Sequence, residues 1–301
     1  MATTHTEVYR SFNGELAKRP VRWWPLFLSE FKVVTRKKLP LVLLYGPVAI
    51  GCIVTLVMVY LAYALESTVS EEAPKMDLAT SMATAMVKSM FEVRMLIVEF
   101  FGSMSVFCLL ASTWYGAGLI CEDRRVNAHL LYFSRPLTRL DYFLGKFTAV
   151  AAFGAFAILV PGILICLMAV VNSEDYAFLS EQGDVIVNAV LYALLWIGTV
   201  SSIVLAISSV APKKTFAMVG CLGFFLLTEV VVSVLGDIGN VESVEYLSLP
   251  RDLDLIANWM MATPGTEFTS EIRNAFLATG GYVSFALLVV ARRLKRMELS
   301  I

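Results

Sequence analysis

Six long apolar stretches, separated by charged segments, dominate the hydrophobic pattern of the chain. They cover roughly Leu39–Leu65, Phe100–Cys121, Phe147–Val171, Val185–Val210, Thr215–Gly236 and Ala275–Ala291. At ~1.5 Å rise per residue each stretch can cross a hydrocarbon layer of about 30 Å, the last being near the lower limit. The apolar runs are continuous and not alternating, which favours helices over a β-barrel. The pattern therefore predicts an all-α polytopic membrane protein with six transmembrane helices.

Composition agrees with this prediction. Of the 301 residues 58% are hydrophobic and 16% are charged, whereas soluble domains average about 25% charged residues. The first fifteen residues have no apolar core of the kind that marks a cleaved signal peptide. All five cysteines fall in or at the ends of apolar stretches without metal-ligand spacing, so we expect them to be small core residues and expect no metal site.

Lys and Arg are distributed very unevenly between the two sides of the predicted membrane domain. Nineteen of them fall in residues 1–38, the 122–146 loop, the 213–214 turn and the tail from residue 292, and five fall in the alternate loops. Because cytoplasmic loops are enriched in Lys and Arg, both termini are predicted to be cytoplasmic. The predicted domains are thus a cytoplasmic segment 1–38, a membrane domain 39–291 with outer loops 66–99, 173–184 and 237–274, and a basic tail 292–301.

Residues 22–37 predict a helix that lies on the membrane surface. At 100° per residue one apolar arc contains Trp23, Trp24, Phe27, Leu28, Phe31 and Val34, and the charged residues, Glu30 among them, take the opposite arc. Paired tryptophans suit the headgroup layer. The segment is either a generic anchor or a brace for the first span.

The loop 122–146 is the most strongly patterned connection in the chain. Val126, Leu130 and Phe133 fall on one stripe of a predicted helix over 122–134, with Arg124 and Arg125 roughly opposite. Pro136 ends this helix and disfavours helical geometry at Arg135, and Thr138 with Asp141 resembles the capped start of a new helix. The loop therefore predicts a helix, a sharp corner and a second helix, which is either a plain cytoplasmic connection or a rigid docking element.

This segment resembles the loop after the second span in permeases of ABC transporters of the type-2 exporter family. Those permeases commonly show an acidic-basic start, then leucines, a Ser/Thr-Arg-Pro or Thr-Pro, a Ser/Thr-Arg, and a Gly-Lys at the third span. The matching residues are Glu122, Arg124, Leu130, Leu131, Ser134, Arg135, Pro136, Thr138, Arg139, Gly145 and Lys146. The six spans, the cytoplasmic termini and the N-terminal amphipathic helix extend the resemblance to the whole layout. The family often has Gly-Thr where Asn127 and Ala128 stand here.

The resemblance implies that 122–134 is a coupling helix that docks on a separate ABC ATPase subunit. The residues expected to make that contact are Glu122, Arg124, Arg125, Val126, Leu130, Phe133 and Arg135, with Trp23, Trp24, Phe27 and Phe31 forming the interface helix. It also implies a dimer with a second permease copy or a paralogue, in the bacterial cytoplasmic (inner) membrane.

No residues for catalysis or nucleotide binding stand out in the sequence. There is no GxxxxGK[ST] loop, and segments outside the spans are too short for an ATPase domain. His5 and His129 are the two histidines, and neither lies in a predicted span. We therefore expect no catalytic residues, no cofactor and no nucleic-acid partner for this chain, and expect ATP and Mg²⁺ to be bound by the partner subunit.

Two features of the outer side stay open at this stage. Glu229 is the one acid well inside a predicted span, so it either has a role in a transport pathway or in helix packing, or is a side chain that snorkels toward the outer surface. Residues 237–275 contain Leu253, Ile256, Trp259 and Met260 at helical spacing and predict either a re-entrant or interfacial pair of short helices or a folded loop.

The function predicted from these features is that of a membrane-spanning permease subunit of an ATP-driven exporter. The alternative is a non-transporting membrane anchor or scaffold that recruits a cytoplasmic partner.

Overall fold

The fold was obtained as a computed structural model, which describes residues 22–36, 38–72, 92–133, 137–173, 176–239, 247–262 and 267–298. These residues form helices and no strand. In chain order the helices are α1 (Trp24–Thr35), α2 (Lys38–Glu72), α4 (Val93–Gly116), α5 (Cys121–Arg125), α6 (Ala128–Phe133), α7 (Arg139–Gly154), η2 (Ala155–Leu159), α8 (Val160–Asn172), α9 (Ala177–Val210), α10 (Lys214–Gly239), α11 (Leu249–Met261) and α12 (Ser270–Glu298).

Six helical segments in the described part of the chain are long and apolar enough to cross a membrane. They are Pro40–Ala64, Val93–Arg125, Arg139–Asn172, Ala177–Val210, Lys214–Val234 and Ser270–Met297. Each contains most of one stretch predicted from hydropathy. The predicted all-α polytopic membrane fold is therefore confirmed.

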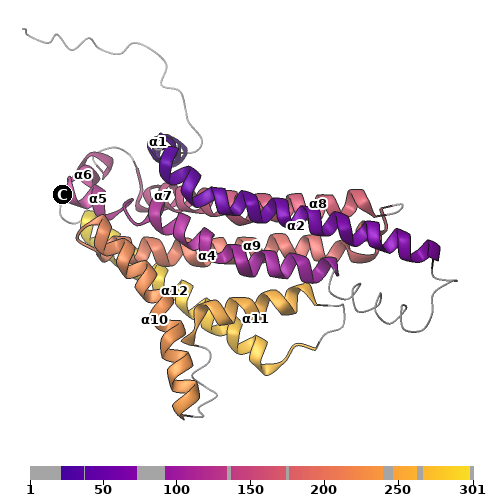
Figure 1. Cartoon of the computed structure of the whole chain (residues 1–301). Helices are drawn as coiled ribbons and strands as arrows, with labels where there is room; N and C mark the ends of the chain where they lie inside the picture. The colour runs from indigo at the N-terminus through magenta and orange to yellow at the C-terminus, as the bar shows by residue number, and fades with distance from the viewer. Residues whose placement is uncertain are drawn as a thin grey trace, which may run out of the picture.

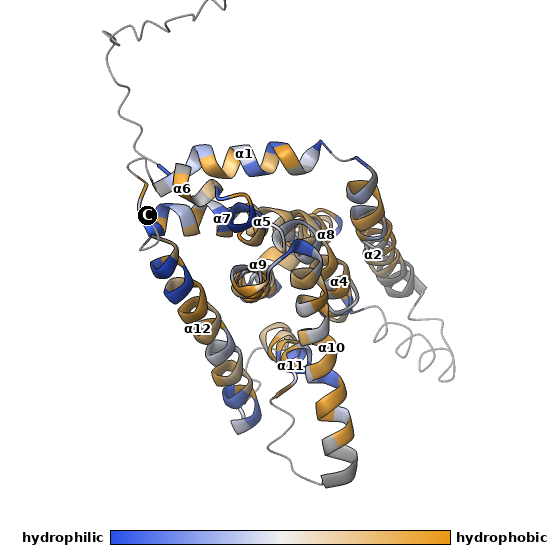
Figure 2. Cartoon of the chain, turned by 90° about the vertical axis from the view of Figure 1, so that its left-hand side faces the viewer, coloured by the Kyte–Doolittle hydropathy of each residue, from blue (hydrophilic) through white to orange (hydrophobic). Residues whose placement is uncertain are grey.

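Helix α9 lies at the centre of the bundle. In the most apolar part of α9, 67% of the residues are buried, whereas the corresponding share is 22% in each of α2, α10 and α12. Helices α4, α7, α8 and α12 pack against it (Figure 1). Helices α10 and α12 lie apart from each other, and α11 lies between them (Figure 2). The outer helices expose large apolar side chains such as Ile50, Leu226 and Phe285, as expected for surfaces that contact lipid.

The third span is a continuous rod made of α7, η2 and α8. Its middle turn, η2, has the wider π-helical winding and is followed closely by Pro161, which lacks a backbone N–H. Neighbouring helices donate to carbonyls beside this turn: the Tyr45 hydroxyl of α2 donates to Phe153 O at 2.8 Å, and the Cys108 thiol of α4 contacts Gly154 O at 3.7 Å. The irregular turn is thus anchored on two sides.

Several helices extend into segments predicted as outer loops. Helix α9 begins at Ala177, within the predicted 173–184 loop, and is kinked at Gln182. Among its described residues the 237–274 segment contains one complete helix, α11, which packs against α12, α9, α4 and α10. The helical spacing of Leu253, Ile256, Trp259 and Met260 thus corresponds to a helix, and the alternatives of a helix pair or a folded loop extend over residues outside the described ranges.

Candidate functional site

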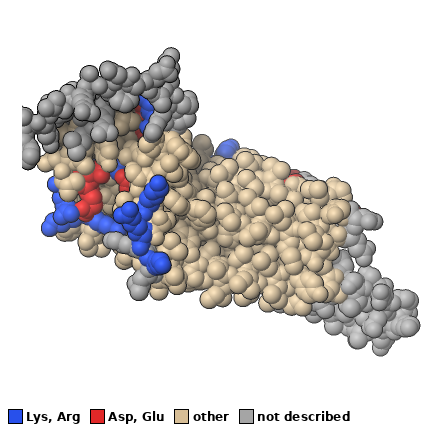
Figure 3. Space-filling model, turned by 90° about the horizontal axis from the view of Figure 1, so that it is seen from above, with Lys and Arg blue, Asp and Glu red and all other residues tan. Residues whose placement is uncertain are grey.

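Charged side chains gather at one end of the molecule. Figure 3 shows Lys, Arg, Asp and Glu at that end, while most of the remaining described surface in this view is uncharged. The same end holds α1, α5, α6 and the beginning of α7 (Figure 1). The described residues among those predicted for partner contact thus belong to elements at one end of the bundle.

Lys146 of α7 is the central charge of this end. Its side chain is fully buried, and its Nζ lies 2.6 Å from Glu30 Oε1 of α1 and 2.7 Å from Asp123 Oδ2 of α5. A buried ammonium is tolerated only when opposite charges and hydrogen bonds replace the water that it loses. The two carboxylates therefore tie α1 and α5 to the third span through one cation.

Two tyrosines complete the group, which we call the Lys146 cluster: Glu30, Asp123, Tyr132, Tyr142 and Lys146. The Tyr142 hydroxyl donates to Asp123 Oδ2 at 2.8 Å. Lys146 Nζ lies 5.5 Å and 5.7 Å from the ring centroids of Tyr142 and Tyr132, within the range of a cation–π contact. Burial raises the pKa of the Tyr132 hydroxyl, which keeps this phenol neutral. Through Tyr132, α6 joins the same cluster.

The aromatic residues predicted for the interface helix contact one another in succession along α1. Successive centroids of Trp23, Trp24, Phe27 and Phe31 lie 5.8, 5.0 and 5.8 Å apart. The last ring, Phe31, stacks on Phe153 of the third span at 5.3 Å. Glu30, on the charged arc of this helix, pairs with the buried Lys146 of α7, a partner that the periodicity alone did not indicate.

Close approach of α1 to α7 depends on Gly145. A Cβ at this position would lie 2.7 Å from Leu26 Cδ2 and 3.1 Å from Leu26 Cβ. Leu26 itself is buried against the third span. In the Gly-Lys pair, Gly145 therefore allows α1 to pack closely on α7, and Lys146 forms the ion pair between these two helices.

Gly145→Ala is expected to lower the free energy of unfolding by about 1–2 kcal/mol, although alanine favours a helix, because the new methyl group overpacks the contact with Leu26. Thermal unfolding of the purified protein measures the effect. Gly102→Ala is the matched control, since a Cβ at Gly102 of α4 meets nothing within 4 Å. Equal stability changes for the two variants would contradict this role of Gly145.

The predicted coupling helix is two short helices in the structure. Helix α5 ends at Arg125 and α6 begins at Ala128, and Asn127 between them has a positive φ of 55°. The expectation of one helix over 122–134 is thus wrong. Asparagine is one of the few residues besides glycine that adopt this left-handed conformation readily, which explains why Asn127 can stand where the resembling permeases often have glycine.

Apolar side chains are exposed on this turn and on α6. Val126 is 62% exposed and Leu130 is 38% exposed, and both lie at the charged end. Glu122 and Arg125 form an exposed ion pair with a 2.6 Å contact. Phe133 is the last residue of α6, and Arg135 lies outside the described residues. We call Val126 and Leu130 with this turn the coupling face.

Arg124, expected among the docking residues, points inward. Its guanidinium donates to Ser209 O and to Ala211 O, the latter at 2.9 Å, at the carboxyl end of α9. Arg293 of α12 also donates to Ser209 O, at 3.2 Å. Cations near a helix carboxyl end are favourable because they satisfy the last carbonyls. Arg124 therefore ties α5 to α9.

Ser208 is a residue of this site that sequence reasoning missed. Its buried hydroxyl donates to Ala117 O at 2.7 Å and accepts from the backbone N–H groups of Ile120 and Cys121 at 3.2 and 3.3 Å. It thus supports the turn between α4 and α5 from the side of α9. A serine in an apolar span gives no sequence signal for such a contact.

The start of α7 follows the prediction closely. Asp141 N–H donates to Thr138 Oγ1 at 3.1 Å, and Thr138 N–H donates to Asp141 Oδ2 at 3.1 Å. This capping box fixes where the third span begins, about two turns before Lys146.

Away from the charged end, Glu229 of α10 supports the beginning of α11. Its carboxylate accepts from the Ser248 hydroxyl and lies 3.8 Å from Arg251 Nη2. Ser248 in turn accepts from Arg251 N–H at 3.4 Å as the N-cap of α11. The role of Glu229 in a pathway stays a prediction.

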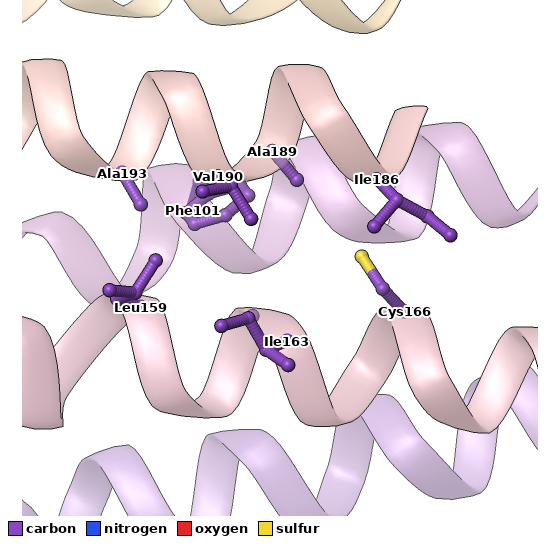
Figure 4. A pocket seen from close by; sticks show the side chains of 9 residues that line it. Phe101, Leu159, Ile163, Cys166, Ile186, Ala189, Val190 and Ala193 are labelled. Carbon is purple, nitrogen blue, oxygen red and sulfur yellow. The ribbon is translucent and has the colours of Figure 1, made fainter. Parts of the chain in front are cut away.

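A small hollow lies between α8, α9 and α4 (Figure 4). It is lined by Phe101, Leu159, Gly162, Ile163, Cys166, Ile186, Ala189, Val190 and Ala193. These nine residues offer no charged group to a ligand.

Comparison with known proteins agrees with the layout. A protein-family model described as ABC-2 family transporter protein matches residues 24–298. The match runs from the first residue of α1 to the last residue of α12. No match was found among curated proteins.

Proposed function

The chain belongs to the ABC-2 family of transporter membrane proteins, and on that premise we propose that it is the permease subunit of an ATP-driven exporter. Two such subunits, or one with a paralogue, form the translocation pathway. ATP and Mg²⁺ are bound and ATP is hydrolysed by a separate ABC ATPase subunit. This chain transmits the resulting movement and performs no chemistry.

The Lys146 cluster is the observation that carries the proposal. It joins α1, α5, α6 and α7, so a force on the coupling face reaches the third span through buried contacts. Breaking a buried ion pair by removing one partner costs about 3–5 kcal/mol, so these elements are expected to move as one unit. A plain connecting loop has no need of such a cluster.

The coupling face has the character of a docking surface. Exposed apolar side chains surrounded by charged ones are typical of protein interfaces. Val126 and Leu130 supply the apolar part, and the exposed pair Glu122–Arg125 lies beside them. We place this end in the cytoplasm of a bacterial cell, at the inner membrane, because Lys and Arg gather there.

The test replaces Val126 and Leu130 together by aspartate in the permease co-expressed with its ATPase subunit. We expect at least about tenfold weaker association, equivalent to roughly 1.4 kcal/mol, since two apolar contacts become charged. Co-purification and ATP-dependent transport in proteoliposomes are measured.

The control is Glu181→Lys, an exposed charge reversal near the start of α9, at the opposite end of this helix from Ser209 and Arg124. Unchanged association of the Val126/Leu130 variant would refute docking at the coupling face. A stable complex that never transports would favour the scaffold function.

A further inference from the structure

Helix α11 is held at both ends on the outer side of the bundle. At its start, the Tyr282 hydroxyl of α12 donates to Leu247 O at 3.0 Å, and Glu229 of α10 accepts from Ser248. At its end, the Asn188 side chain of α9 donates to Met260 O at 2.6 Å. Contacts from three different helices therefore fix where α11 lies.

Arg94 of α4 is the strongest of the anchors at the end of α11. The residue is 7% exposed, and its guanidinium donates to Ala262 O at 2.9 Å and to Met261 O at 3.4 Å. Its two terminal nitrogens also meet the two oxygens of Asp184, each at 3.1 Å. Both charges of this pair are thus satisfied.

Asp252 lies between these anchors and has no such partner. The buried face of α11 consists of Leu249, Asp252, Leu253, Ile256, Ala257 and Met261. Asp252 is 1% exposed, and neither of its carboxyl oxygens has a hydrogen-bond partner among the described residues. Among the described residues this carboxyl group therefore meets neither a cation nor a hydrogen-bond donor, and its one favourable electrostatic contact is its place in the first turn of α11, which is worth about 0.3–1 kcal/mol.

The arginines around α11 and the Tyr282 hydroxyl have partners other than Asp252. Arg94 binds Asp184, and Arg251 lies beside Glu229. The Tyr282 hydroxyl donates to a backbone carbonyl, and Asp254 lies on the exposed side of α11. The Tyr192 hydroxyl of α9 is buried and likewise without a partner among the described residues.

The neutral form of Asp252 is the one that this packing stabilises. An ionised carboxylate without a partner costs several kcal/mol in a buried site, whereas the protonated acid costs far less. In keeping with this, burial raises the pKa of Asp252 to about 7. At neutral pH the group therefore lies close to its titration midpoint.

We propose that Asp252 is a proton-binding site, protonated while α11 is packed between α10 and α12 and deprotonated when α11 leaves that position. Because proton uptake and packing are linked, acid stabilises the packed position of α11, and alkaline conditions favour its release. The inference does not depend on an ATPase partner.

The test follows thermal unfolding of the purified permease without nucleotide or partner, from pH 5.5 to 8.5. The folded-state pKa of this acid lies above its unfolded value, so the stabilisation by the bound proton is present at acid pH and lost as pH rises through about 7. Relative to Asp252→Asn, which cannot ionise, we expect the wild-type Tm to fall by several degrees across that range. Glu271→Gln, which removes an exposed acid of α12, should follow the wild type.

Parallel curves for wild type and Asp252→Asn would overturn the proposal. A sodium-dependent rise in Tm at pH 8 that Asp252→Asn abolishes would overturn it in favour of a monovalent-cation site. Should the variant fail to fold, infrared spectroscopy of wild type labelled at aspartate decides the question. A protonated-carboxyl band that titrates near pH 7 supports the proposal, and its absence at pH 6 refutes it.

Discussion

Replacing Lys146 with alanine is expected to lower the free energy of unfolding by about 3–5 kcal/mol, the largest single-residue effect in the described part of the protein. The change leaves Glu30 and Asp123 close together, largely buried and without their shared cation. Thermal or denaturant unfolding of the purified permease measures the loss. ATP-driven transport is expected to fall with it, since α1 and α5 lose their connection to the third span.

A neutral version of the cluster separates stability from transmission. The triple variant Lys146→Met, Glu30→Gln, Asp123→Asn removes all three charges together, and we expect it to recover most of the lost stability, because no unpaired charge stays buried. A loss below about 1 kcal/mol for Lys146→Ala would mean that water compensates the two carboxylates and that the cluster is not a rigid connection.

Arg94→Ala is expected to destabilise the protein by about 3 kcal/mol, because it removes charged hydrogen bonds to Asp184 and to two carbonyls at the end of α11. The damage should be local to α11 and its neighbours. Relative to wild type, hydrogen exchange is expected to become faster in α11 than in α9, and thermal unfolding gives the total effect.

Two further variants sharpen this prediction. Arg94→Lys keeps the charge but cannot present a planar fork to both partners, so we expect an intermediate loss. Arg273→Ala, an exposed arginine of α12, is the control and should change stability by less than about 0.5 kcal/mol. Equal exchange rates in α11 for wild type and Arg94→Ala would show that this helix is held by its apolar face alone.

The spans and the fold class were predictable from the sequence because continuous apolar runs of this length have few other structural solutions. The capping box at Thr138 and Asp141 was predictable for a similar reason, since it is a local pattern. The family match agrees with the resemblance drawn from the 122–146 loop.

Contacts between distant positions were not predictable in this way. Lys146 stood out as part of a Gly-Lys pair, yet nothing in the sequence indicates that Glu30, more than a hundred positions earlier, is its partner. Periodicity places Glu30 on the polar arc of its helix, which is consistent with solvent as well as with an ion pair. Arg124 shows the same limit, because charge alone does not tell whether a side chain faces a partner protein or α9.

The break at Asn127 shows what local patterns leave out. The stripe of Val126, Leu130 and Phe133 suits one helix, and a single residue with positive φ is enough to divide it. On the outer side, the alternatives for 237–275 were balanced because a short amphipathic helix is stable only against neighbours. The anchors that settle its position, Arg94 and Asn188, belong to other spans.

The π-helical turn in the third span affects the spacing of the buried residues along α7, η2 and α8. Buried residues recur every four positions, as in Lys146, Val150, Gly154, Ile158 and Gly162. A regular helix completes a turn every 3.6 residues, so a four-residue repeat drifts around it by about 40° each time. The wider winding of η2 takes up part of that drift, which lets both halves of the rod face α4 and α9. The buried positions of the third span therefore follow a longer repeat than an ideal α-helix. Inserting or deleting one residue near η2 would rotate the inward-facing side chains of one half by about 100° relative to those of the other half.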